Sequence, residues 1–167
     1  MSEGALAGPG EPPAAGWRIA RERYADLSGE GARLKGGRWN SPGRAVVYLS
    51  QDPALPLIEV LVHLDLTPDL VPQDYVIMKV DFTSFAERPL DDWLEDGPGE
   101  PMNETESAAF GDAWLEAGRT AVLRVPSVIV PEAFNLILNV AHPLAADLPP
   151  PEKRPFSFDR RLFSAGD

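Results

Sequence analysis

Two segments of the chain alternate between apolar and other residues with a period of two. They are "DYVIMKVDF" at residues 74–82 and "FNLILNV" at residues 134–140. The apolar side holds Val76, Met78, Val80 and Phe82 in the first segment, and Phe134, Leu136, Leu138 and Val140 in the second. Such alternation predicts β-strands with one face in a core, so the chain must build a sheet.

The other elements decide what kind of sheet this is. Further strands are predicted at residues 17–24, 45–50, 120–131 and 156–163, and helices at residues 52–66 and 103–118. Strands outnumber helices and do not alternate with them regularly, which predicts a mixed α+β domain. Pro126 interrupts one strand pattern and predicts an edge or a bend there.

Both predicted helices carry terminal signals. Asn103 and Glu106 fit a capping box for the second helix, and Gly118 fits its end. Asp52 is a candidate N-cap for the first helix, but Pro56 moves the regular part of that helix toward Leu55.

Composition narrows the class of protein. The chain has 167 residues, a formal net charge of −11 and no cysteine. Its acidity argues against direct nucleic-acid binding, and the missing thiols exclude disulfides and thiolate metal sites. No apolar run reaches the ~20 residues that cross a bilayer, so we expect a cytoplasmic protein without membrane contact. Residues 1–16 are rich in Gly, Pro and Ala and predict a disordered arm before a single domain at residues 17–167.

Glu59 is the first candidate site residue. It lies in "LIEVLVHL", where apolar residues cover most of the helix and only Glu59 and His63 interrupt them. A solvent-facing strip with a weak local pair is the simpler interpretation. The strongly apolar flanks predict a nearly buried helix, which favours a carboxylate placed in a cleft.

A polar, glycine-rich loop at residues 26–43 supplies the second candidate, Arg38. Gly36 and Gly37 allow the backbone to approach a ligand closely, and a guanidinium binds phosphate through two parallel hydrogen bonds. The alternative is a tight turn with a surface arginine. Arg18, on the first predicted strand, has the same two interpretations.

Tyr48 and Ser127 complete the candidates that the residues themselves suggest. A strand tyrosine usually packs with its hydroxyl satisfied locally, and a serine after Pro126 usually bonds nearby backbone. His63 and His142 form no metal-binding motif, so metal-dependent hydrolysis is disfavoured, and His142 is expected to cap a turn.

These signals occur in one order: "WRI", "GEGARLKGGRWNSPG", "VVYLS", "LIEVLVHL", "GDAWL", "VPSVIVP", "NLILN" and "HP". In this order the chain resembles the RES domain family, the toxins of bacterial RES–Xre toxin–antitoxin pairs, over residues 17–162. The resemblance implies an ADP-ribosyltransferase-like fold, a mixed split β-sheet with flanking helices. It also implies NAD as a substrate, with no metal.

The resemblance assigns roles to residues of this chain. Arg38, Glu59 and Ser127 would be catalytic; Arg18, Arg38, Tyr48, Ser127, Trp39 and Asn40 would bind NAD. Glu59 would stabilise the oxocarbenium-like ribose, the two arginines would hold phosphates, and Tyr48 would stack on nicotinamide.

The family further implies a cognate Xre-type antitoxin and allows inorganic phosphate as a co-substrate and a homodimer within the assembly. Three functions stay open at this point: an enzyme that cleaves NAD by phosphorolysis or hydrolysis, a protein ADP-ribosyltransferase, and a non-catalytic nucleotide-binding module.

Overall fold

A seven-stranded mixed sheet with the order β4-β5-β6-β2-β1-β3-β7 forms the centre of the computed structural model, which describes residues 10–64, 68–100 and 102–163. Its strands are β1 (Ala15–Arg21), β2 (Val46–Ser50), β3 (Tyr75–Asp81), β4 (Leu94–Asp96), β5 (Val122–Pro126), β6 (Phe134–Asn139) and β7 (Glu152–Pro155). Only β4 and β5 pair in parallel in this sheet. The predicted mixed α+β class is confirmed.

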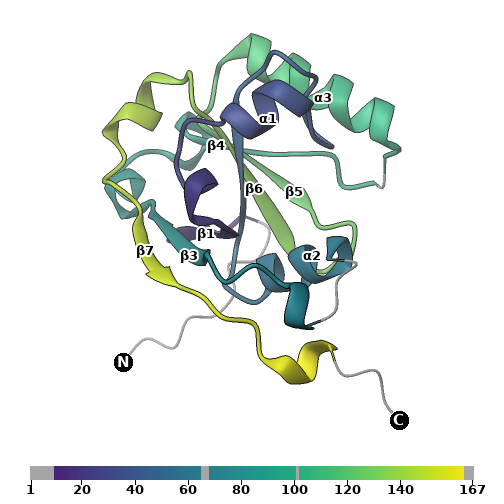
Figure 1. Cartoon of the computed structure of the whole chain (residues 1–167). Helices are drawn as coiled ribbons and strands as arrows, with labels where there is room; N and C mark the ends of the chain where they lie inside the picture. The colour runs from purple at the N-terminus through teal and green to yellow at the C-terminus, as the bar shows by residue number, and fades with distance from the viewer. Residues whose placement is uncertain (1–9, 65–67, 101, 164–167) are drawn as a thin grey trace.

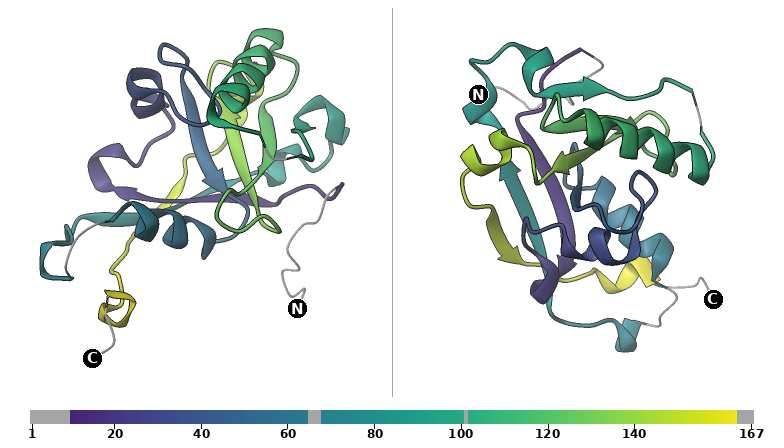
Figure 2. Two further views of the ribbon diagram at one scale, coloured as in Figure 1. Left: turned by 90° about the vertical axis from the view of Figure 1, so that its right-hand side faces the viewer. Right: turned by 90° about the horizontal axis from the view of Figure 1, so that it is seen from above.

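The sheet is split between β1 and β2. These two strands share a single register pair, Trp17 with Ser50, whereas β1 and β3 are paired along their whole length. Figure 2 (left) shows the β1–β3–β7 half crossing the end of the β2–β6–β5 half. A split sheet of this kind was the architecture that the resemblance implied.

Three α-helices flank the sheet: α1 (Glu30–Lys35), α2 (Leu55–His63) and α3 (Glu104–Ala117). Figure 1 places α1 and α3 near one end of β6, and α2 near the other end, where it contacts β1 and β2. Short 3-10 turns lie at Glu22–Tyr24, Pro68–Leu70, Thr83–Phe85, Leu90–Asp92, Pro143–Asp147 and Arg160–Phe163.

Two apolar clusters cover the two faces of β2 and β6. The first contains Val47, Leu49, Met78, Val80, Phe82, Phe85, Trp93, Leu94, Ala121, Val122, Leu136 and Leu138. The second contains Trp39, Val46, Trp114, Leu123, Val125 and Ile137. The predicted inner side of the strand at residues 74–82 is confirmed. In β6, Ile137 on the predicted outer side is also fully buried, so β6 is a central strand buried on both faces.

The predicted start and end signals of the two helices are confirmed. Asn103 accepts from the Glu106 N–H, and the Glu106 carboxylate accepts from the Asn103 N–H, while Gly118 ends α3 with φ of 57°. Helix α2, the first of the two predicted helices, begins at Leu55, as Pro56 predicted, and the Asp52 carboxylate accepts from the Ala54 and Leu55 N–H groups.

Other predicted elements differ from the structure. Helix α1 lies inside the predicted loop at residues 26–43, and β4 lies in a region where no strand was predicted. The last strand is Glu152–Pro155, whereas the predicted strand at residues 156–163 contains a 3-10 turn. Pro126 marks the end of an internal strand, so it corresponds to the bend and not to an edge.

The predicted N-terminal arm lies partly outside the described residues, which begin at residue 10. Ala15 and Gly16, assigned to that arm by composition, already belong to β1. Before them, the carbonyl of Glu11 accepts a hydrogen bond of 2.7 Å from the buried Arg124. The ordered domain therefore begins before Trp17.

Candidate active site

The loop that carries Arg38 is built around the hydroxyl of Tyr48. This hydroxyl accepts from the Trp39 N–H at 2.9 Å and donates to Asn40 Oδ1 at 2.7 Å. A Cβ on Gly37 would lie 2.6 Å from the same hydroxyl, so only glycine fits there. Burial raises the pKa of Tyr48 to about 12, which keeps the phenol protonated at neutral pH.

Asn40 fastens the other side of this loop. Its amide Nδ2 donates to the carbonyl groups of Ala32, Ser41 and Arg44, at 3.0, 3.2 and 3.0 Å. Asn40 is buried, and the hydrogen bonds of its side chain go to backbone carbonyl groups and to the Tyr48 hydroxyl. The structure therefore gives Asn40 a loop-building position, while its predicted contact with NAD stays a prediction.

Helix α3 packs against the same loop. A Cβ on Gly111 would lie 1.8 Å from the carbonyl oxygen of Trp39, so helix and loop meet backbone to backbone. The Asp112 carboxylate accepts from the Ser41 N–H at 2.9 Å, and Phe110 packs edge-on against the Trp39 indole. Trp39 is thus a buried anchor of the loop.

Arg38 is held by one end of its guanidinium. Nη2 donates to the Met102 carbonyl at 2.7 Å, just before α3. Its buried Nε has no hydrogen-bond partner among the described residues. A buried donor without a partner is costly. The side chain as a whole is only half-buried, so an anion would meet the other N–H groups of this guanidinium.

The Glu59 carboxylate meets the far end of β5 and β6. Oε1 accepts from Asn135 Nδ2 at 2.6 Å and from Ser127 Oγ at 3.5 Å. Glu59 is half-buried, and these contacts replace the predicted local pair with His63, which is exposed. Of the catalytic candidates, Glu59 and Ser127 are therefore brought together directly.

Ser127 also has the backbone role that its place after Pro126 suggested. Its Oγ accepts from the N–H groups of Ile129 and Val130, at 3.2 and 3.3 Å. The side chain is buried, at 2% exposure. Its hydroxyl proton is then directed at Glu59. The local interpretation is confirmed, and the catalytic and NAD-binding roles of Ser127 stay predictions.

The loop of Arg38 and the Glu59 carboxylate lie along the same face of the sheet. Tyr48 and Ser50 lie two residues apart on β2, so their side chains point to the same side, about 7 Å apart. Ser50 pairs in register with Asn135 of β6, the partner of Glu59. Polar side chains thus continue along this face from the Arg38 loop to Glu59.

Arg18 has a different position. It pairs in register with Met78, which lies in the first apolar cluster, while the adjacent Trp17 pairs with Ser50. Because neighbouring residues of a strand point to opposite faces, Arg18 points to the face opposite to that of Trp17 and Ser50. Burial lowers the pKa of Arg18, an effect that Asp26 partly offsets. Within the described part of the chain, no hydrogen bond or ion pair links Arg18 to the other candidates.

Helix α2 is less buried than its composition predicted. Ile58 is 38% exposed and Val62 is 62% exposed, so the prediction of a nearly buried helix is wrong. The helix packs on β1 and β2 with one side only, and Ile58 and Val62 lie on the side away from the sheet. His142 accepts from the Leu144 N–H through Nδ1, which confirms the predicted cap.

Sequence reasoning missed Ser50, Asn135, Gly111 and Asp112 as parts of this site. Gly111 and Asp112 occur in the "GDAWL" segment, and a glycine inside a predicted helix is a signal of close packing. Ser50 and Asn135 carried no separate signal, because their role depends on the pairing of β2 with β6.

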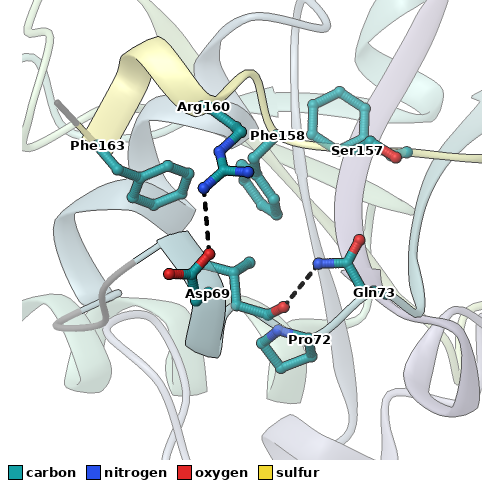
Figure 3. Close-up of a pocket in the computed structure, with 9 residues that line it drawn as sticks. Asp69, Pro72, Gln73, Ser157, Phe158, Arg160 and Phe163 are labelled. Carbon is teal, nitrogen blue, oxygen red and sulfur yellow. Dashed lines mark hydrogen bonds and ion pairs between the residues drawn. The ribbon is translucent and has the colours of Figure 1, made fainter.

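A separate cavity of about 280 Å³ lies away from these residues (Figure 3). It is lined by Phe156, Phe158 and Phe163 of the C-terminal segment and by residues 71–73, and the Arg160–Asp69 ion pair spans it.

Residues 10–64, 68–100 and 102–163 contain no cluster of three metal-ligating side chains and no helix suited to cross a membrane.

Comparison with known proteins adds family and fold. The family model described as "RES domain" matches residues 15–159. A Sphingobium protein named "Prs ADP-ribosylating toxin" is 38% identical over 159 residues, covering 87% of this chain and 94% of that protein. A Pseudomonas putida protein named "Toxin Res" is 35% identical over 150 residues, covering 88% and 98%.

Among solved structures, a chain of the M. tuberculosis MbcT–MbcA toxin–antitoxin complex superposes with a TM-score of 0.64. The match covers 89% of this chain and 86% of that one at 18% identity, so it supports the fold alone.

Proposed function

The chain belongs to the RES domain family, and from this membership we propose that it is the NAD-consuming toxin of a toxin–antitoxin pair, cleaving the bond between nicotinamide and ribose. The observation that carries the proposal is the anchored carboxylate of Glu59, on the same sheet face as the loop of Arg38. The similarity to toxins over nearly the full length of both chains supports it.

In the proposed reaction, the bond between the ribose C1′ and the nicotinamide nitrogen breaks, and its electron pair leaves with neutral nicotinamide. The ribose becomes an oxocarbenium-like cation. Glu59 stabilises this positive charge as it develops, and Ser127 orients the carboxylate or bonds a ribose hydroxyl. Phosphate or water then forms the new bond to C1′.

Arg38 binds the pyrophosphate of NAD or the incoming phosphate through guanidinium N–H groups other than the one bonded to Met102 and the buried Nε. Tyr48 builds the loop with its hydroxyl, which leaves its half-buried ring to stack on nicotinamide. Trp39 and Asn40 hold the loop that carries Arg38 and would act on NAD through it. Arg18 contributes positive charge from β1, and its site role is the one that contacts in the structure support least.

We further propose an antitoxin as the inhibitory partner, since relatives are named as toxins and one fold relative lies in a toxin–antitoxin complex. A net charge of −11 suits a partner with a basic docking face, and the same charge disfavours DNA. An Xre-type partner and a homodimer within the assembly remain expectations of the family. We expect the toxin in the cytoplasm, where it would meet both NAD and such a partner.

Protein ADP-ribosylation is the second candidate function. The Sphingobium relative, at 38% identity, carries "ADP-ribosylating" in its name. The two reactions share the breaking of the nicotinamide bond and differ in the group that attacks C1′. Glu59 and Arg38 would serve both reactions in the same way.

The experiment mixes the purified protein with NAD, with and without inorganic phosphate, and follows free nicotinamide. Phosphate-dependent release indicates phosphorolysis, and release without phosphate indicates hydrolysis. Transfer of labelled ADP-ribose to protein, only after desalted cell extract is added, indicates the second function. NAD binding without release indicates a non-catalytic module and contradicts the proposal.

Replacing the carboxylate tests its role. Glu59→Gln should lower turnover about 10²–10³-fold, because the positive charge in the transition state loses its counter-charge. Glu87→Gln is the matched control, since Glu87 is exposed in a turn and makes no hydrogen bond or ion pair with the site residues in the described part of the chain. Equal turnover in both variants would reject Glu59 as the catalytic carboxylate.

A further inference from the structure

Asn135 on β6 has its amide between two site residues. Nδ2 donates to Glu59 Oε1 at 2.6 Å, and Oδ1 accepts from Ser50 Oγ at 2.9 Å. Ser50 is only 2% exposed and faces Asn135 in register across β2 and β6. A rigid strand pair therefore supplies the closest contact to the carboxylate on α2.

Only one orientation of this amide suits both neighbours. With the amide turned over, its oxygen would face the carboxylate oxygen of Glu59, and two acceptors would be in contact. In the observed orientation, the Ser50 hydroxyl donates to the amide oxygen and the amide donates to the carboxylate. The three side chains form a directed chain of hydrogen bonds.

This chain leaves the two carboxylate oxygens unequal. Oε1 accepts from Asn135 and Ser127, whereas Oε2 has no hydrogen-bond partner in the described part of the structure. We propose that Asn135 is a positioning residue that holds Glu59 through Oε1 and so leaves Oε2 to the substrate. The proposal rests on the proposed function for its kinetic consequence, but its contact can be tested without activity.

Helix α2 needs such an anchor. It packs on β1 and β2 while Ile58 and Val62 are exposed, so apolar packing holds it from one side alone. Displacement of a catalytic group by about 1 Å can cost on the order of 100-fold in rate. A short, charge-assisted hydrogen bond from a buried strand restricts this displacement.

The test is Asn135→Asp, which keeps the shape and replaces the donor with a second carboxyl group. Two adjacent carboxylates raise the pKa of one of them. At low pH the pair shares a proton, and the introduced carboxylic acid donates to Glu59 as the amide did. As pH rises, both groups ionise and repel. We expect kcat on the order of 100-fold below the unsubstituted protein at about pH 8, and within about tenfold at about pH 5, with KM nearly unchanged.

Asn139→Asp is the matched control on the same strand. Asn139 is buried, and its Oδ1 accepts from the Ala141 N–H, a contact that aspartate retains. This variant should keep the pH profile of the unsubstituted protein. His63, one turn along α2 from Glu59, is present in all three proteins and cancels in the comparison. A kcat ratio for Asn135→Asp that does not change with pH would overturn the proposal.

Unfolding by urea across the same pH range gives a readout that needs no catalysis. The stability lost by Asn135→Asp should grow as pH rises, since the pair of carboxylates exists only in the folded state. If this trend is absent, the contact is not what holds Glu59. If the trend is present while the unsubstituted protein cleaves no NAD, the proposed function fails and the positioning contact stands.

Discussion

Gly111 is the point at which α3 touches the loop of Arg38, and Gly111→Ala should disturb both stability and catalysis. The added Cβ would lie 1.8 Å from the Trp39 carbonyl oxygen and 2.7 Å from the carbonyl carbon. Both are backbone atoms, so no side-chain rotation relieves the contact. A normal carbon–oxygen contact is about 3.3 Å, so helix and loop must separate by about 1.5 Å.

The cost follows from this separation. Overpacking of this kind typically destabilises a domain by about 1–3 kcal/mol. Arg38 precedes Trp39 directly, so the same movement displaces its guanidinium and should lower the rate of nicotinamide release on the order of 100-fold. Urea unfolding followed by tryptophan fluorescence measures the first effect, and initial rates under conditions where the variant is folded measure the second.

Gly31→Ala is the matched control. Gly31 is also a helical glycine, in α1, but an added Cβ would meet no atom within 4 Å. Alanine there should stabilise the protein by up to about 1 kcal/mol, because it has the higher helix propensity. If Gly111→Ala were as stable and as active as the unsubstituted protein, the close approach of α3 to the loop would be refuted.

Two further predictions concern stability. Asn103→Ala removes the side-chain cap of α3 and should cost about 1 kcal/mol in urea unfolding; an unchanged midpoint would contradict the capping box. The Thr83 N–H donates to the Asp81 carboxylate and lowers the pKa of that carboxyl below its unfolded value of about 3.9. The stability that this contact contributes is complete above about pH 3.9 and is lost as pH falls through the folded pKa of Asp81. Asp81→Asn should therefore be less stable than the unsubstituted protein at about pH 7 and nearly equal at about pH 2; a difference independent of pH would argue against it.

The parts of the fold that the sequence predicted are those with local signals. Helix α3 has its cap at Asn103 and its stop at Gly118 within one continuous segment, and α2 starts where Pro56 permits. Strand β3 alternates as a strand with one buried face should, although Ile77 is buried as well. Each of these elements is determined by residues a few positions apart.

The missed elements lack such signals. Helix α1 has six residues, contains Gly31 and begins at Gly29 without a side-chain cap. Strand β4 has three residues and exists through its parallel pairing with β5, which is distant in sequence. Strand β7 reads "EKRP", a charged and exposed edge strand without an apolar side.

The alternation of Phe156 and Phe158 suggested a strand but serves another purpose. Phe158 packs edge-on against Tyr75 and Phe156, at centroid distances of 5.0 and 5.1 Å. Phe163 joins the same aromatic group, which lines the C-terminal cavity. Apolar periodicity in a short segment indicates burial, and it does not by itself distinguish a strand from a packed loop.

The candidate site shows the same division between local and distant information. The turn at Gly36 and Gly37, the position of Arg38 and the backbone bonds of Ser127 follow from nearby residues. Glu59 was a candidate because its helix is otherwise so apolar, and the resemblance added its catalytic role. What joins Glu59 to the sheet is a hydrogen bond across 76 positions of sequence, made by an asparagine that looks like any polar residue of a strand. Only the register of β2 with β6 puts Ser50 beside Asn135, and only then does the amide acquire one orientation. The carboxylate that we propose as catalytic lies on a half-exposed helix and therefore depends on the pairing of two central strands. Changes in that pairing should alter turnover without any change in the residues proposed to contact NAD.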